Sequence, residues 1–231
     1  MANSEENPVL GAVISPDGKY LAFADTTGAY LRQIDSGETH SLNLQSGFRA
    51  VPAAWYPDGS HLVATWVKGP TAPSSLWQVS ILGGEPRELI DEGRLPAVSP
   101  NGRQIAFLRG PKHAEEIWTM DANGENPKVV AHCKMCTFGT PAWSPDGQVI
   151  AYVISSYREN WTLHTSLILL DLSSGHQETL LSPESQRAPG AQMEIRPPLV
   201  WTSDNRLIYS ISELPPNENE SNVWSGTARF P

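Results

Sequence analysis

The tetrapeptide Ser144-Pro145-Asp146-Gly147 returns along the whole chain, and its recurrence decides the fold. The other copies are Ser15-Pro16-Asp17-Gly18, Tyr56-Pro57-Asp58-Gly59, Ser99-Pro100-Asn101-Gly102 and, in degraded form, Thr202-Ser203-Asp204-Asn205. The third residues of successive copies lie 41, 43, 45 and 58 positions apart. A period in the forties is typical of a repeat architecture, in which each unit buries its apolar face only against its neighbours.

The residues around each tetrapeptide also recur. A short apolar stretch precedes it and ends in Trp55, Trp143 or Trp201 in three copies, and an alternating apolar run follows it in all five. These runs are four to six residues long, rich in β-branched and aromatic residues and bounded by turn formers, which predicts strands. Pro-Asp-Gly predicts a tight turn, because proline presets φ, aspartate bonds its own backbone and glycine accepts a positive φ.

A third and a fourth strand follow in each of the first four units, separated by another turn that carries glycine. Four short antiparallel strands in about forty residues form a propeller blade. The sequence therefore predicts an all-β propeller in a single domain, residues 1–231, with four complete blades and a partial fifth. The expected blades cover residues 8–44, 50–90, 95–131, 140–181 and, incompletely, 198–231.

The repeat resembles the WD-repeat-like blades of TolB-type β-propellers. The likeness rests on Trp-Ser-Pro-Asp-Gly, an apolar strand and then Leu-Trp-x-Val-x-x-x-Gly-Gly, and it covers nearly the whole chain. Two strings, residues 30–40 and 76–87, further resemble the propellers that follow the catalytic domain of some bacterial serine/threonine kinases or the DNA-binding domain of some regulators. This second resemblance implies a sensor or interaction role in a larger signalling protein.

The fifth unit stops after its third strand, whereas a closed ring would leave no such edge unpaired. We therefore expect a segment of a longer propeller, and the alternative is a complete five-bladed ring with an incomplete last blade.

Composition restricts the partners and the compartment. A net charge of −9 and a pI near 5.1 disfavour nucleic acid and anionic membrane surfaces, because no basic face is present to bind them. No apolar stretch approaches the ~20 residues needed to span a bilayer, and no signal peptide is visible. We expect a cytoplasmic protein if the chain is complete, and an extracytoplasmic or periplasmic one if it is attached to a membrane kinase.

The only Cys-x-x-Cys is Cys133 to Cys136, in the connection between the third and fourth blades. Such a pair can form a local disulfide, act as a redox pair, stay as loop thiols or supply half of a zinc site. Because no other cysteine exists to complete a zinc site, we expect a disulfide or a redox pair and no metal.

Repetition also argues against a metal at the turn aspartates, since a residue that recurs once per blade serves the blade's own structure. No Gly-x-Ser-x-Gly elbow, kinase catalytic loop or glycine-rich phosphate loop is present, so we expect no catalytic residue and no cofactor. Any kinase or hydrolase activity would lie outside this chain.

The strand-two to strand-three loops and the connections between blades emerge on one face of a propeller, which we call the loop face. Aromatic and cationic residues of the kind enriched at binding hot spots occur in these loops. The candidate binding residues are Arg109, His113, Tyr157, Arg158, Trp161 and Arg196. An alternative is that Trp161 packs on its own blade and the arginines are solvated.

The sequence thus predicts a non-catalytic sensor or protein-interaction propeller of a larger bacterial signalling protein, with a protein, peptide or small ligand on the loop face. The alternative is the accessory propeller of a serine peptidase or a TolB-like periplasmic binding protein.

Overall fold

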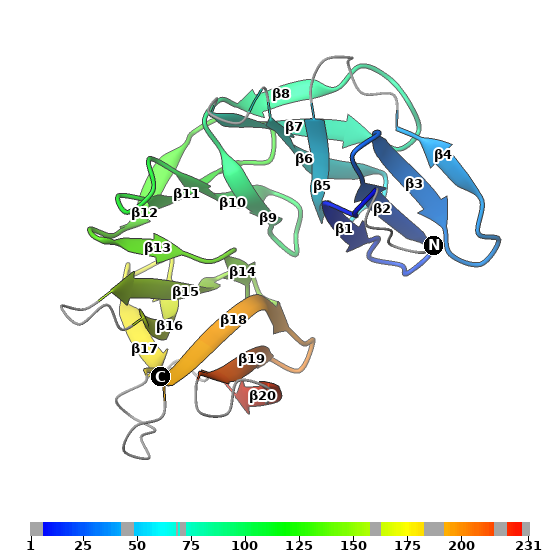
Figure 1. The fold of residues 1–231 in the computed structure, drawn as a ribbon. Coiled ribbons are helices and arrows are strands. Elements are labelled where there is room, and N and C mark those ends of the chain that lie inside the picture. The colour runs from blue at the N-terminus through cyan, green and yellow to red at the C-terminus, as the bar shows by residue number, and fades with distance from the viewer. Residues whose placement is uncertain are drawn as a thin grey trace. The chain divides into compact units, whose positions relative to one another are not determined.

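The computed structural model describes residues 7–42, 49–67, 69, 73–157, 163–182, 192–214 and 221–227, and these form strands and turns without a helix (Figure 1). Consecutive strands pair antiparallel into separate sheets, each built from one sequence repeat. The fold is therefore the all-β, propeller-like array of blades that the repeat predicts, with four complete blades and a fifth sheet of three strands.

The first two blades follow the repeat closely. The first contains β1 (Gly11–Ile14), β2 (Tyr20–Ala24), β3 (Ala29–Gln33) and β4 (Thr39–Ser41). The second contains β5 (Arg49–Trp55), β6 (His61–Val67), β7 (Ser74–Ser80) and β8 (Arg87–Ile90).

The remaining sheets show two departures from the repeat. The third blade contains β9 (Arg94–Val98), β10 (Gln104–Arg109), β11 (Glu116–Asp121) and β12 (Lys128–His132). The fourth contains β13 (Cys136–Phe138), β14 (Ala142–Trp143), β15 (Val149–Tyr157), β16 (Leu163–Asp171) and β17 (Gln177–Leu181). The fifth contains β18 (Gln192–Trp201), β19 (Arg206–Leu214) and β20 (Ser221–Thr227).

The first departure is a divided inner strand in the fourth blade. Both β13 and β14 pair with β15, and Gly139 to Pro141 interrupts them. Pairing resumes at Ala142, and these three residues lie opposite only Tyr152 and Val153 of β15, so the inner strand is bulged there. The sheet thus begins at Cys136, before the expected start at residue 140.

The second departure is the length of the hairpins in the fourth and fifth sheets. Pairing of β15 with β16 continues from Val149 out to Tyr157, beyond the apolar run that follows the turn. Likewise β18 begins at Gln192 and β19 ends at Leu214. The residues involved include several serines and threonines, which end the apolar pattern without preventing backbone pairing.

A bulge recurs between the third and fourth strands of three blades. The register shifts at Leu76/Trp77, at Ile117/Trp118 and at Leu167/Ile168. These are the same positions in the repeat, and a bulge increases the local twist of the outer strand.

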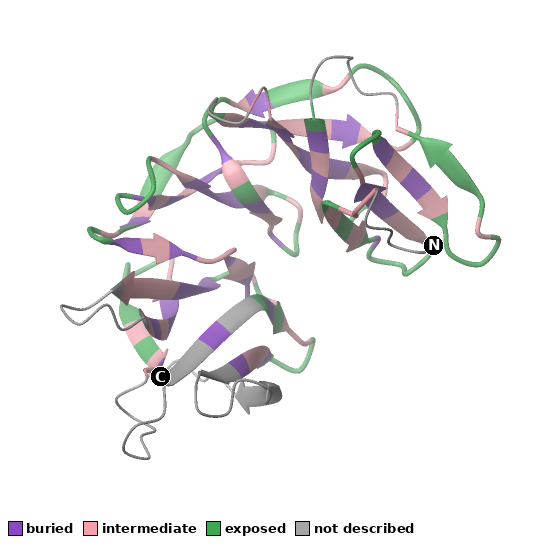
Figure 2. Ribbon diagram, in the orientation of Figure 1, coloured by how far each residue is buried: buried purple, intermediate pink, exposed green. Residues whose placement is uncertain are grey.

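The core lies between neighbouring blades. Residues 1–106 and 120–127 form one compact unit, and residues 107–119 and 128–231 form a second. In the first, Leu62 and Ala64 pack with Ala22 and Leu31 of the preceding blade. In the second, alternate residues of β15 pack against β18 and β19. Figure 2 shows that buried residues are concentrated in the strands. In β10 the four successive residues from Ile105 to Leu108 are all buried.

Candidate binding site on the loop face of the third blade

Two loops of the third blade lie against each other at the same end of the sheet. The amide of Met135, in the β12–β13 turn, donates to the carbonyl oxygen of His113, in the β10–β11 loop, at 2.8 Å. The amide of Cys133 donates to the carbonyl of Glu115 at 3.2 Å, and Ala114 forms an isolated parallel bridge with Cys136. The loop and the turn are therefore one backbone-bonded assembly.

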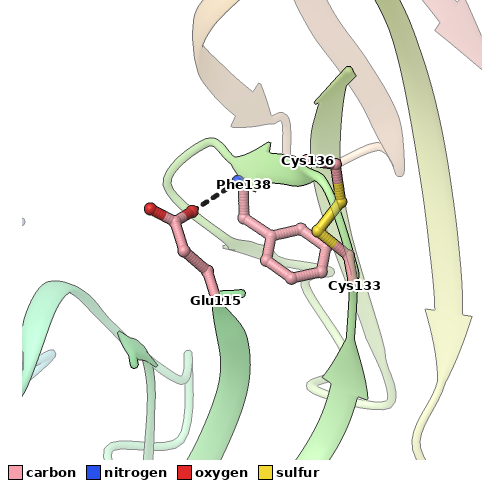
Figure 3. The surroundings of a disulfide bond; sticks show 4 residues. All are labelled: Glu115, Cys133, Cys136 and Phe138. Carbon is pink, nitrogen blue, oxygen red and sulfur yellow. Dashed lines mark hydrogen bonds between the residues drawn. A yellow bond between two sulfur atoms is a disulfide. The ribbon is translucent and has the colours of Figure 1, made fainter. Parts of the chain in front are cut away.

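The buried side chain of Glu115 holds this assembly to the neighbouring strand β13. This side chain is 6% exposed, and its Oε2 accepts a hydrogen bond from the amide of Phe138 at 2.8 Å (Figure 3). A carboxylate that accepts from a backbone amide forms one of the stronger hydrogen bonds in proteins. Glu115 therefore ties the β10–β11 loop to the first strand of the fourth blade.

A disulfide joins Cys133 to Cys136, with Cα atoms 5.9 Å apart (Figure 3). Cys136 begins β13 and is buried, so this half of the disulfide belongs to the blade and not to an exposed loop. The bond closes the β12–β13 turn, and Met135 projects from that turn with 78% of its surface exposed.

The backbone of both loops passes through a conformation that is unusual for residues with a side chain. His113 has a φ of 70° and Met135 a φ of 61°, and these two residues share the hydrogen bond that joins the loops. Such conformations persist only where the surroundings hold them, and they are concentrated at functional sites. The disulfide and the contacts of Glu115 supply that support here.

Arg109 is held at the base of the same loop. Its Cζ lies 5.3 Å from the ring centroid of Trp118, a cation–π distance. The indole Nε1 of Trp118 donates to Oε2 of Glu116 at 2.9 Å, which orients the ring. Arg109 is therefore positioned by the neighbouring strand.

The other predicted residues are placed only in part. Ser156 pairs with Cys136, so the backbone of Tyr157 ends β15 beside the disulfide. Arg196 lies in β18 next to Ile195, whose amide donates to Oγ1 of Thr165 at 2.9 Å. Arg158 and Trp161 lie outside the described residues. Sequence reasoning did not select Glu115, because a Glu-Glu pair beside a loop has the pattern of a solvated surface.

The opposite end of the blades is built from the repeated turns. Oγ of Ser144 donates to Oδ1 of Asp146 and accepts from the amide of Val149, while the amide of Gln148 donates to Asp146 at 3.0 Å. The turn at Ser99 to Gly102 has the same bonds, with Asn101 in place of aspartate. In the first turn, the hydrogen bond from Ser15 lowers the pKa of the Asp17 carboxyl. The turn residues thus bond to one another.

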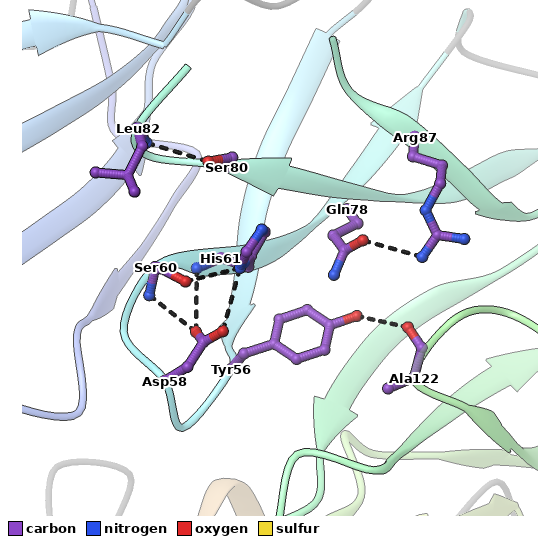
Figure 4. A network of polar contacts seen from close by, with 9 residues as sticks. All are labelled: Tyr56, Asp58, Ser60, His61, Gln78, Ser80, Leu82, Arg87 and Ala122. Carbon is purple, nitrogen blue, oxygen red and sulfur yellow. Dashed lines mark hydrogen bonds and ion pairs between the residues drawn. The ribbon is translucent and has the colours of Figure 1, made fainter. Parts of the chain in front are cut away.

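A polar network at the turn end of the second blade also consists of side chains that bond to other residues of the chain (Figure 4). The hydroxyl of Tyr56 donates to the carbonyl of Ala122 at 2.9 Å, and burial raises the pKa of Tyr56 to about 12. Arg87 donates to the carbonyl of Asn123 at 2.8 Å. Although Asp58, Ser60 and His61 are adjacent, the carboxylate and the hydroxyl both contact Nδ1 of the histidine, so they do not form a relay.

Within the described residues, no cluster of three or more His, Cys, Asp or Glu side chains could hold a metal ion. The same part of the chain has no helix long and apolar enough to cross a membrane.

No protein-family model matches this sequence. The Tol-Pal system protein TolB of Acinetobacter baylyi is 35% identical over 85 residues, which are 36% of this chain and 19% of that protein. An uncharacterised protein of Agrobacterium fabrum is 28% identical over 156 residues, covering 60% of this chain and 52% of the relative. The chain thus spans about half or less of the curated relatives it matches.

Solved structures show the same fold at low identity. TolB from Acinetobacter baumannii superposes with a TM-score of 0.63 at 19% identity, over 91% of this chain and 53% of that one. An oligogalacturonate lyase in complex with manganese superposes with a TM-score of 0.62 at 16% identity, over 87% of this chain and 61% of that one. A prolyl endopeptidase superposes with a TM-score of 0.55 at 12% identity, over 95% of this chain and 42% of that one. These likenesses identify a TolB-like β-propeller fold.

Proposed function

We propose that this chain is a non-catalytic interaction or sensor propeller of a larger bacterial signalling protein and that it binds a protein or peptide through its loop face. The observation that carries the proposal is the bonded pair of loops in the third blade. Exposed side chains are presented there on a backbone fixed by hydrogen bonds, a disulfide and a buried carboxylate. Rigid presentation lowers the entropy lost on binding, which is how scaffolds support recognition loops.

The signalling assignment rests on the strings at residues 30–40 and 76–87, which resemble kinase-associated propellers. The disulfide supports an extracytoplasmic setting, since such bonds persist in oxidising compartments. The parent reading frame tests this part directly. A kinase or DNA-binding domain upstream supports it, and a Ser-His-Asp hydrolase domain downstream contradicts it.

The alternative is the accessory propeller of a serine peptidase or a TolB-like periplasmic binding protein. The TolB and prolyl endopeptidase structures favour it, because both contain a propeller of this fold. Neither alternative places catalysis in this chain.

The binding experiment selects peptides from a random phage-displayed library on the immobilised full chain and measures their Kd for variants. Replacing Arg109, His113, Tyr157, Arg158 and Trp161 by alanine should weaken binding at least about tenfold. Asp146→Ala, at the turn end, is the control and should leave the Kd unchanged. If the turn variant weakens binding as much as the loop variant, the loop face is not the site.

A further inference from the structure

We propose that the bonded loops of the third blade bind an acidic peptide segment of a partner protein that carries an apolar residue among its carboxylates. The proposal rests on the proposed function and names the partner of the same site. The side chains concerned are exposed and form what we call the cationic rim: Lys112, His113, His132, Lys134 and Met135.

The rim is a single surface because its two halves share backbone bonds. Met135 donates to the carbonyl of His113, so Lys134 and Lys112, the preceding residues, flank a closed contact between the loops. The parallel bridge of Ala114 with Cys136 continues that contact on the other side.

Charge is distributed unevenly between this surface and the rest of the chain. The whole sequence has 25 acidic and 16 basic residues, yet residues 109–114 and 132–136 contain no aspartate or glutamate. Glu115, which follows the first loop, is buried against the amide of Phe138. Glu116 lies opposite His132 in the β11–β12 ladder, but it is half-buried and accepts a hydrogen bond from Trp118. The rim therefore presents the cations of Lys112 and Lys134 without a fully exposed carboxylate from its own loops, and an anionic ligand is attracted to it.

The rim also contains one apolar side chain, that of Met135. Met135 is 78% exposed, follows Lys134 directly, and bonds through its amide to His113, the residue after Lys112. Methionine is unbranched and polarisable, so it adapts to varied apolar side chains. A ligand with carboxylates on both sides of one apolar residue would pair with the lysines and cover the methionine.

The overall charge favours a short acidic peptide over nucleic acid. A long polyanion extends beyond the rim and meets the field of a chain with a net charge of −9, whereas a peptide stays within the cationic area. The backbone at His113 and Met135 already has its loop conformation before binding. A short peptide can therefore bind without an additional entropic cost of ordering these loops.

The test uses fluorescence anisotropy with the full chain and a fluorescein-labelled peptide whose core is Glu-Glu-Leu-Glu-Glu. We expect this peptide to bind, and the Gln-Gln-Leu-Gln-Gln and Glu-Glu-Ser-Glu-Glu peptides to bind at least about tenfold and about threefold more weakly. The variant Lys112→Glu/Lys134→Glu should weaken binding of the acidic peptide at least about tenfold. A labelled oligothymidylate should bind more weakly than the acidic peptide.

The matched control is Arg103→Glu/Lys128→Glu, two exposed positions at the opposite end of the strands of the same blade, which changes the net charge equally. It should retain binding, and both variants should retain the wild-type melting temperature. Equal losses in the two variants, equal binding of the glutamine peptide, stronger binding of the oligothymidylate, or no binding of the acidic peptide would overturn the inference.

These failures are distinguishable from failure of the proposed function. Library-selected peptides that need the loop face but lack acidic residues and tolerate Lys112→Glu/Lys134→Glu would contradict the acidic partner alone. Selected peptides that ignore every loop variant would contradict both.

Discussion

The indole Nε1 of Trp55 donates a hydrogen bond to the carbonyl oxygen of Val13, 42 residues earlier in the chain, at 3.1 Å. Val13 lies in β1 and Trp55 in β5, which are the first strands of successive blades. Trp201 repeats the contact with the carbonyl of Ala142 at 3.2 Å. The tryptophan that precedes the repeated turn is therefore a link to the blade before it.

Trp55→Phe should lower the free energy of unfolding by about 1 kcal/mol beyond the change in packing, because the carbonyl of Val13 loses its donor. Hydrogen exchange of the folded chain should show the loss of protection within residues 7–67. Trp201→Phe is the control, and its effect should lie among residues 128–214. Equal protection in wild type and Trp55→Phe would show that the contact does not stabilise the blades.

Asp146→Ala should lower the free energy of unfolding by about 1 kcal/mol, since Ser144 and the amide of Gln148 both lose their acceptor. Asp146→Asn should be nearly neutral, because Asn101 makes the same bonds in the third turn. Urea denaturation of both variants measures the difference. If the asparagine variant were as unstable as the alanine variant, the charge and not the acceptor would hold the turn.

Two buried tyrosines should respond oppositely to loss of the hydroxyl. Tyr56→Phe removes a hydrogen bond to Ala122 and should lower the free energy of unfolding by about 1 kcal/mol. The hydroxyl of Tyr152 is buried beside Phe138 and has no hydrogen-bond partner in the described part of the chain. Tyr152→Phe should therefore raise the free energy of unfolding by up to about 1 kcal/mol. A loss on both substitutions would contradict the assignment for Tyr152.

The same tyrosines predict a loss of stability in alkali. Burial raises the pKa of Tyr56 and of Tyr152 to about 12, above the ordinary value of 10.0. The unfolded chain releases these protons first, so their contribution is complete below pH 10 and disappears as the pH rises toward 12. Denaturation series across this range should be flatter for either phenylalanine variant than for wild type.

Cys133→Ser/Cys136→Ser should lower stability by about 2 kcal/mol for so short a loop and speed exchange of the Met135 amide. A dithiol reductant should have the same effect on wild type. The serine variant is the control, and the reductant should leave it unchanged. If the reductant altered both proteins equally, the disulfide would not be what orders the turn.

The blades could be predicted from the sequence because their signals are local. Each tetrapeptide contains its own turn chemistry, and the alternating run beside it needs no distant partner to be recognised. The recurrence of Trp55 and Trp201 was visible too, but their acceptors were not, since each lies on the preceding blade. For the same reason the contact of His113 with Met135 could not be predicted from two unrelated loops.

The predictions from the sequence were least accurate where the apolar periodicity does not mark the end of a strand. Polar residues such as Ser155 and Ser156 interrupt the apolar pattern, yet they continue β15 because backbone pairing does not require apolar side chains. The division of β13 from β14 at Gly139 to Pro141 depends on one extra residue opposite β15, which the apolar pattern does not reveal.

The repeated bulge between third and fourth strands also affects how separate molecules meet. Among the described residues β8, β12 and β17 each end their sheet, and they are only four or five residues long. Added twist, together with charged residues such as Arg87, Lys128 and Glu178, makes these edges poor templates for a strand of another chain. We therefore expect the bulges to disfavour edge-to-edge pairing of these three sheets between molecules in concentrated solution.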